Sequence, residues 1–193
     1  ADFCFSLSFF VLGISDSFLL TKKLLFVTFG RHMHIAMIGQ KGVPARSGGI
    51  EKHVEELSTR LLRKGHKVTA YARSWYGDKS EKTFNGMKVQ YLPSINTKHL
   101  DAFSHTFFAA LHASLIERPD VIHFHGVGPS LFSFIPRILR PQATVITTFH
   151  CIDRHHGKWG SFARFMLGMG EKAAVEFGHS TIAVSKTLKN YIA

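Results

Sequence analysis

The stretch from His34 to Leu57, HIAMIGQKGVPARSGGIEKHVEEL, determines how the chain begins to fold. Its apolar run at 34–39 ends in glycine and predicts a short buried strand. Apolar residues then recur at helical spacing from Ile50 onward, with glutamates in the early turns, as the helix dipole favours. A loop rich in glycine, proline and basic side chains joins the two. The stretch therefore predicts a strand, a glycine-rich loop and a helix.

Short apolar runs alternate with helical patterns along the rest of the chain. This alternation predicts parallel pairing in a doubly wound, Rossmann-like α/β sheet. Right-handed crossovers give the strand order 3-2-1-4-5-6, which reverses between the first and fourth strands. Ligands bind such sheets beyond the carboxyl ends of the strands, at this switch point. The other expected strands are 67–72, 87–92, 120–125, 144–149 and 180–184. The other expected helices are about 99–117, about 130–139, 160–178 and 185–193.

The composition is that of a globular domain with a basic surface. The 193 residues are 45% hydrophobic and 19% charged, and the formal net charge is +11. Such a charge favours acidic partners: phosphorylated ligands, an anionic membrane surface or nucleic acid. The basic residues are scattered, so we expect no nucleic acid. Two cysteines cannot form a disulfide framework, which favours a reducing, cytoplasmic location.

Residues 1–32 differ from the Rossmann-like domain expected at 33–193. Their apolar run FCFSLSFFVLGISDSFLL (3–20) is followed by TKK. A signal peptide is disfavoured because no charged region precedes the run. Two alternatives stay open: an extension foreign to the domain, or a membrane-associating segment with its positive charges on the cytoplasmic side.

The glycine-rich loop has two possible roles. Gly48 and Gly49 let the backbone approach a ligand closely, and the N–H groups of the following helix would point at an anion. Lys41 and Arg46 would add positive charge, whereas Glu51 opposes an anion unless it turns outward or binds a sugar hydroxyl. The loop matches neither the P-loop nor the dinucleotide fingerprint. A purely structural turn therefore remains an alternative to anion binding.

The histidines near the fourth strand also have several interpretations. His123 and His125 are two residues apart on a strand, so they point to the same face. They could ligate zinc together with His150, His155 and His156, although no carboxylate or cysteine stands at a matching spacing. They could instead be satisfied histidines that line a crevice. The third interpretation is that His125, at the end of the strand, contacts the reacting group.

The loop after the fifth strand, HCIDRHHGKWG (150–160), combines polar side chains with an indole. Asp153 could bind sugar hydroxyls while Trp159 packs on a sugar ring. The alternative is a helix-entry loop with Trp159 in the core. Cys151 is adjacent to His150, but neighbouring side chains on extended backbone point apart, so a catalytic thiol is disfavoured.

Four stretches together resemble family 4 glycosyltransferases of the GT-B fold, most closely the bacterial polysaccharide type that includes rhamnosyltransferase-like proteins. They are the stretch 33–73, which contains the opening motif, DVIHFHGVGPS (120–130), TTFHCIDRHHGKWGSFAR (147–164) and EKAAVEFGHSTIAVSKTLKNYI (171–192). The resemblance covers Met33 to the C-terminus.

The resemblance implies roles for individual residues. Gly48 and Gly49 would lie against the donor diphosphate, and His125 near the transferred sugar. The loop after the fifth strand would bind the sugar or the acceptor, although Cys151 replaces a usual glycine there. Such enzymes resemble retaining transferases that need no metal or other cofactor and have no assigned protein nucleophile. The implied sugar- or acceptor-binding residues are His150, Asp153, Lys158 and Trp159.

The resemblance also implies that the chain is the N-terminal, acceptor-side half of a GT-B enzyme, without the C-terminal nucleotide-binding domain. We expect this half to be inactive alone. With that domain, it would transfer a sugar from a nucleotide-sugar to a glycan or polyprenyl-linked acceptor, at the inner face of the plasma membrane. A non-catalytic module that binds a phosphorylated ligand or partner chain is the main alternative, and a zinc hydrolase is a third.

Overall fold

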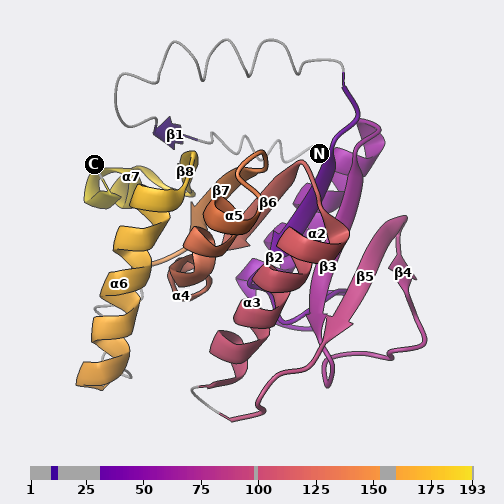
Figure 1. Ribbon diagram of the computed structural model, residues 1–193, viewed down its shortest axis with the longest axis horizontal. Coiled ribbons are helices and arrows are strands. Elements are labelled where there is room, and N and C mark those ends of the chain that lie inside the picture. Colours follow the sequence, from indigo (N-terminus) through magenta and orange to yellow (C-terminus); the bar gives the residue numbers. More distant parts are fainter. Residues whose placement is uncertain (1–9, 13–30, 98–99, 153–159, 193) are drawn as a thin grey trace, which may run out of the picture.

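The computed structural model describes residues 10–12, 31–97, 100–152 and 160–192 (Figure 1). Strands and helices alternate along this part of the chain, as the sequence predicts. The strands are β1 (Phe10–Leu12), β2 (His34–Ile38), β3 (Lys67–Arg73), β4 (Thr83–Phe84), β5 (Met87–Leu92), β6 (Val121–His125), β7 (Thr144–Phe149) and β8 (Ser180–Ala183). The α-helices are α2 (Gly49–Arg63), α3 (Leu100–His112), α4 (Val127–Ser130), α5 (Phe134–Leu139), α6 (Ser161–Phe177) and α7 (Lys186–Ile192).

All eight strands form one sheet in the order β1-β8-β7-β6-β2-β3-β5-β4. The six strands expected from the sequence are parallel and lie in the predicted order, with the reversal between β2 and β6. The doubly wound α/β fold is therefore confirmed. The two short additions, β1 and β4, pair antiparallel at the edges with β8 and β5.

Two predicted helices differ from those observed. The pattern at about 99–117 gives α3 followed by a π-helical turn at Ala113–Glu117, which Arg118 ends with φ 52° before Pro119. The helix predicted at about 130–139 begins earlier, at Val127, and is divided into α4, a 3-10 turn (Leu131–Ser133) and α5. Hydrophobic periodicity locates helical segments but does not reveal such local changes of pitch.

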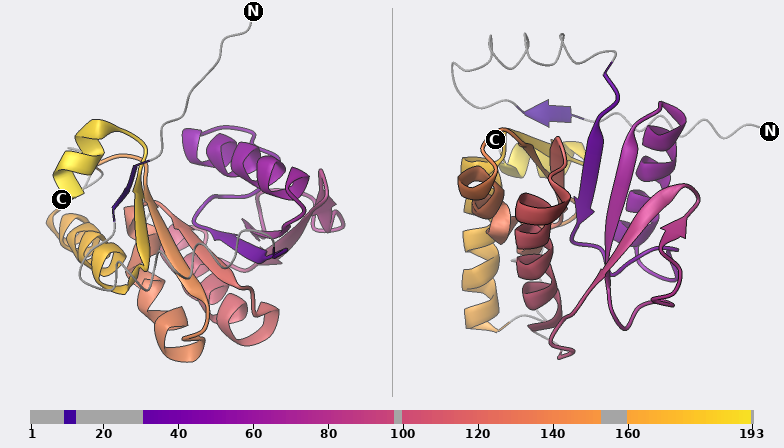
Figure 2. Two further views of the ribbon diagram at one scale, coloured as in Figure 1. Left: turned by 90° about the horizontal axis from the view of Figure 1, so that it is seen from above. Right: turned by 45° about the vertical axis from the view of Figure 1, so that its right-hand side comes forward.

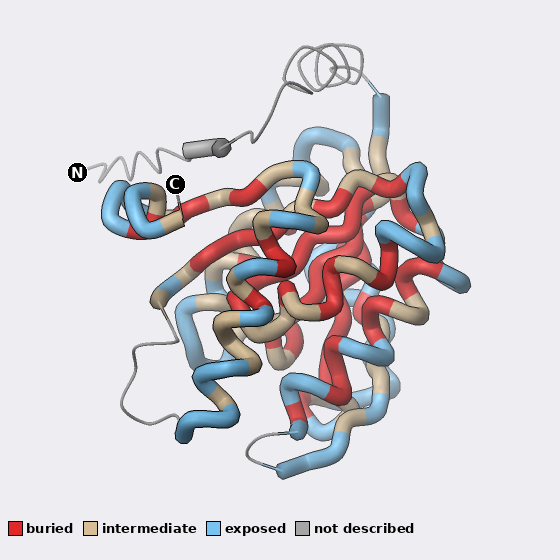
Figure 3. The backbone as a smooth tube through the Cα atoms, turned by 60° about the vertical axis from the view of Figure 1, so that its left-hand side comes forward, coloured by how far each residue is buried: buried red, intermediate tan, exposed pale blue. Residues whose placement is uncertain are grey.

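The sheet has a buried core on each face. Because side chains alternate along a strand, Ala36 and Ile38 of β2 face one core, and Ile35 and Met37 face the other. Helix α2 covers one face and helices α3 and α5 cover the other (Figure 2, left). Figure 3 shows the buried residues concentrated along the central strands. In the described part of the chain, no helix combines the length and apolar character needed to cross a bilayer.

Within this core, His105 of α3 predicts a pH dependence of stability. Burial, and next the nearby Arg73 guanidinium, lower the pKa of His105 from 6.5 to about 4. Between these values only the unfolded chain binds a proton at this site, so stability falls as the solution is acidified. We expect His105→Leu to make that fall shallower by about 1.4 kcal/mol per pH unit. Urea titrations from pH 8 to pH 4 measure the free energy of unfolding of the parent and the variant. If the two free energies changed in parallel with pH, the prediction would be wrong.

Candidate functional site

Three neighbouring parallel strands end together at the switch point. Ile38 of β2 pairs with Phe124 of β6, and His125 of β6 pairs with Thr148 of β7. The carboxyl ends of all three strands therefore lie at one rim, which places the loop after β2 beside His125. This is the shared rim that the sequence predicts, and the rest of the site is built on it.

Helix α2 holds the glycine-rich loop through its own carboxylates. The backbone N–H of Lys41 donates to Glu51 Oε1 at 3.1 Å, and that of Ala45 donates to Glu55 Oε2 at 2.7 Å. The Arg46 N–H donates to the hydroxyl of Tyr76 at 2.9 Å. Glu51 therefore turns inward and is buried. Glu51 therefore does not make the outward turn by which it could avoid opposing an anion.

The paired glycines at the start of α2 have different surroundings. Gly48 is the N-cap, with φ 99° and no side-chain cap, and a Cβ built on it would overlap the Glu51 carboxylate. A Cβ built on Gly49 would meet no atom within 4 Å. Both glycines are exposed. Gly48 is therefore required by the protein's own backbone, whereas the space beside Gly49 is open to a ligand.

His125 is fully buried beneath other imidazoles. Its ring stacks on that of His123 with centroids 4.0 Å apart, and His123 Nε2 lies 2.7 Å from Thr148 Oγ1. Its Nε2 lies 3.4 Å from Met37 Sδ, and its Nδ1 lies 3.4 Å from His150 Nε2. A thioether accepts but does not donate a hydrogen bond. The tautomer with its proton on Nε2 can donate to Met37 Sδ and leaves the Nδ1 lone pair directed toward His150.

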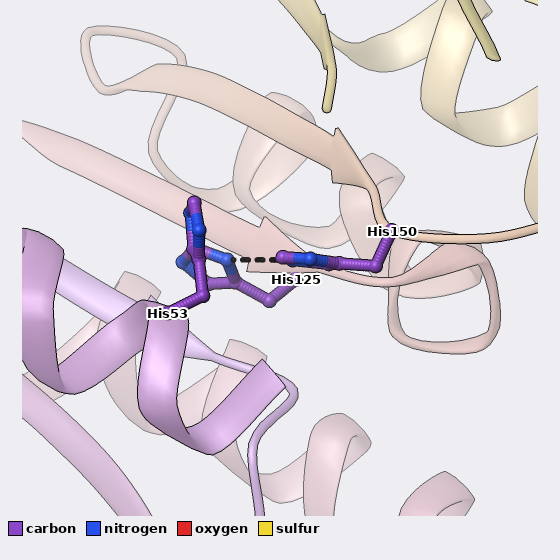
Figure 4. Close-up of side chains that lie close together, drawn as sticks. All are labelled: His53, His125 and His150. Atoms are coloured by element: carbon purple, nitrogen blue, oxygen red, sulfur yellow. Dashed lines mark hydrogen bonds between the residues drawn. The ribbon is translucent and has the colours of Figure 1, made fainter. Parts of the chain in front are cut away.

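A third imidazole, His53 of α2, completes this arrangement. Its ring centroid lies 5.7 Å from that of His125 and 4.8 Å from that of His150. Figure 4 shows the three rings converging from α2, β6 and the segment after β7. We call His53, His125 and His150 the imidazole cluster. Sequence reasoning missed His53, although its place one turn after Gly49 puts it near the rim that the helix start faces.

Electrostatics keep these imidazoles neutral. Burial is the main cause of every shift; neighbouring histidines add to it at His125 and His150, and Arg60 adds to it at His53. The pKa of His125 lies well below 6.5, that of His150 is lowered to about 4, and that of His53 is also lowered. At neutral pH the imidazole cluster therefore offers hydrogen bonds and nitrogen lone pairs, and holds no stored proton for acid catalysis.

The structure places only part of the predicted sugar- or acceptor-binding loop. His150 lies at the rim, half-buried in the imidazole cluster. Cys151 is exposed. Five other residues considered in the sequence lie outside the described residues: Asp153, His155, His156, Lys158 and Trp159.

Comparison with known protein families gives a match over the part of the chain that contains this site. Residues 47–193, which contain the paired glycines and the whole imidazole cluster, match Glycosyltransferase Family 4. The chain belongs to this family. The match begins one residue before Gly48 and runs to the C-terminus, so both sides of the rim lie within this family 4 domain.

Two further matches are partial. An "uncharacterized 42.6 kDa protein in cps region" of Klebsiella pneumoniae is 33% identical over 64 residues. That stretch is 33% of this family 4 chain and spans 17% of the relative's length. The crystal structure of CalG4, the calicheamicin glycosyltransferase, overlaps 72% of this chain and 38% of its own, with a TM-score of 0.43 and 15% identity.

Proposed function

We propose that this family 4 domain is the acceptor-side half of a glycosyltransferase that moves a sugar from a nucleotide-sugar to a glycan or polyprenyl-linked acceptor. The observation that carries the proposal is the meeting, at one rim, of the exposed start of α2 with the neutral His125. The start of the helix suits an anionic leaving group, and the neutral imidazole suits an uncharged sugar. A transferase needs both next to each other.

The donor diphosphate would lie at the start of α2. Backbone N–H groups at a helix N-terminus and the helix dipole together attract anions. The open space at Gly49 admits such a group close to the backbone. Glu51 adds a negative charge nearby, but its carboxylate accepts the Lys41 N–H inside the protein. Lys41 and Arg46, on the same loop, would add positive charge.

The transferred sugar would contact His125. A neutral imidazole can hydrogen-bond a sugar hydroxyl and hold the ring in place for departure of the diphosphate from the same face, as in retaining transfer. His125 is fully buried, with His150 and His53 against it. We therefore expect His150 to turn away when the sugar binds. The proposed reaction uses no metal ion and no protein nucleophile.

The acceptor would be part of bacterial polysaccharide synthesis, of the kind that rhamnosyltransferase-like enzymes perform, at the cytosolic face of the membrane. The net charge of +11 supports this location, because basic proteins are drawn to anionic lipid.

The burial of His125 also favours a second candidate, a non-catalytic module that binds a phosphorylated ligand at Gly49. Two experiments separate the candidates. Full-length protein is incubated with UDP-, GDP- and dTDP-sugars and membrane acceptors, and calorimetry measures nucleotide-sugar binding to residues 1–193. Sugar transfer with weak binding by the domain alone supports the enzyme. Absence of transfer together with tight binding by the domain overturns it.

The paired glycines provide a matched test of the donor site. Gly49→Ala adds a methyl group in open space on a helical residue, so stability should change by less than about 0.5 kcal/mol. The same methyl group would meet the diphosphate and raise the KM for the donor about 10-fold or more.

Gly48→Ala is the structural counterpart. It forces a residue with a side chain to φ 99° against Glu51, and should destabilise the fold by about 1–3 kcal/mol. Donor KM values and urea midpoints measure the two effects. An unchanged donor KM in Gly49→Ala would show that the diphosphate does not bind at the start of α2.

A further inference from the structure

The imidazole cluster has the dimensions of a metal site. One ring nitrogen from each of His53, His125 and His150 lies within 4.8 Å of the others. A tetrahedral ion with metal–nitrogen bonds of about 2.0–2.1 Å holds its ligand nitrogens about 3.4 Å apart. The His125 Nδ1 to His150 Nε2 distance is already 3.4 Å. The other nitrogen pairs lie within 4.8 Å, and rotation of the half-buried His53 and His150 rings would bring them to that spacing.

The surroundings of His125 are compatible with the tautomer that a metal requires. Its Nε2 faces Met37 Sδ, which can accept a hydrogen bond, and with the proton on Nε2 the Nδ1 lone pair faces the cluster. The ring of His123, whose Nε2 lies 2.7 Å from Thr148 Oγ1, packs against that of His125. Outer contacts that set the tautomer and orientation of a ligating histidine are typical of built metal sites.

We propose that His53, His125 and His150 form a three-histidine site for a divalent transition metal ion, with zinc as the reference ion. Three neutral imidazoles without a carboxylate suit zinc, copper or nickel rather than magnesium or calcium. A three-histidine zinc site leaves a fourth position for water. The ion would link helix α2 to the ends of β6 and β7.

The ion would hold His150 and His53 over His125. In the proposed transferase the sugar reaches His125 only when His150 turns away, so the ion would inhibit transfer rather than assist it. The inhibition rests on the proposed function, whereas the binding of the ion does not.

The binding is tested first with metal alone. The chain is titrated with Co²⁺, whose visible absorption reports a tetrahedral nitrogen site, and Zn²⁺ is then added to displace it. We expect each chain to bind one metal ion tightly. Zinc should also raise the melting temperature, because the ion binds only the folded state. His53→Gln should lower the affinity for this metal ion about 100-fold or more, because the loss of a ligand should cost at least as much affinity as the loss of an outer contact.

The control is His32→Gln, which changes an exposed histidine remote from the cluster that contacts the Gly65 carbonyl. It should bind like the parent and shows how much the remaining histidines contribute. Failure to bind one equivalent, or equal affinity in the His53→Gln and His32→Gln variants, would overturn the site.

Inhibition is tested separately in the full-length protein. The ratio of the transfer rate with zinc to the rate with a chelator is compared within each variant. The ratio should be low in the parent and in His32→Gln, and close to one in His53→Gln. Equal ratios in all three, together with confirmed binding, would overturn the inhibitory role and leave the metal site established.

Discussion

Alanine in place of His125 is expected to slow sugar transfer by the full-length protein about 10²- to 10³-fold, the usual loss when one positioned hydrogen-bonding group is removed from an active site. The effect should fall on kcat, because the hydrogen bond to the sugar matters most when charge develops on the ring. His125 lies at the end of β6, with its Nδ1 3.4 Å from His150 Nε2.

His123→Ala is the matched control, because His123 is a buried imidazole on the same strand face, stacked on His125. Each substitution leaves a cavity and should cost about 2–5 kcal/mol of stability, the range for other large buried side chains. Only His125→Ala should lose most of its rate, and added imidazole should restore part of it. Equal rates in the two variants at matched folded fraction would remove His125 from the reaction.

The largest effect on folding is expected at Asp101, in the first turn of α3. Its carboxylate accepts from Arg73 Nη1 at 2.6 Å, from Trp75 Nε1 at 3.0 Å and from Ser94 Oγ at 2.6 Å. Asp101→Ala would leave the Arg73 guanidinium buried without its partner. The cost should be about 3–5 kcal/mol in urea unfolding, as for other broken buried ion pairs.

Two comparisons identify the cause of that loss. The double variant Arg73→Met with Asp101→Leu should recover much of the stability, because removing both charges removes the unpaired one. Arg60→Ala breaks the pair of Arg60 with Glu56, in which the two side chains are 62% and 46% exposed, and should cost about 0–1 kcal/mol. If Asp101→Ala costs no more than Arg60→Ala, the buried pair has no special weight.

The strands and their order could be predicted from the sequence because they depend on local patterns and on the handedness of crossovers. Apolar runs such as 34–38 and 121–125 mark buried strands, and parallel pairing then places their ends at one rim. The position of His125 follows directly, since it is the last residue of β6.

The details of the site depend on tertiary packing that periodicity does not encode. His53 joins the imidazole cluster only because the packing of α2 against β3 and β5 carries it to His125 and His150. The inward turn of Glu51 depends on the path of the preceding loop, which bends back to bring the Lys41 N–H to it. The burial of His125 likewise depends on where the segment after β7 carries His150.

The bonds from Glu51 and Glu55 to the preceding loop tie that loop to the helix that follows it. Any tilt of α2 would carry Gly49, His53 and the basic loop together as one rigid unit. A small rocking of this single helix would then change the spacing between His53 and His125 and, in the same movement, shift the helix start relative to the end of β6.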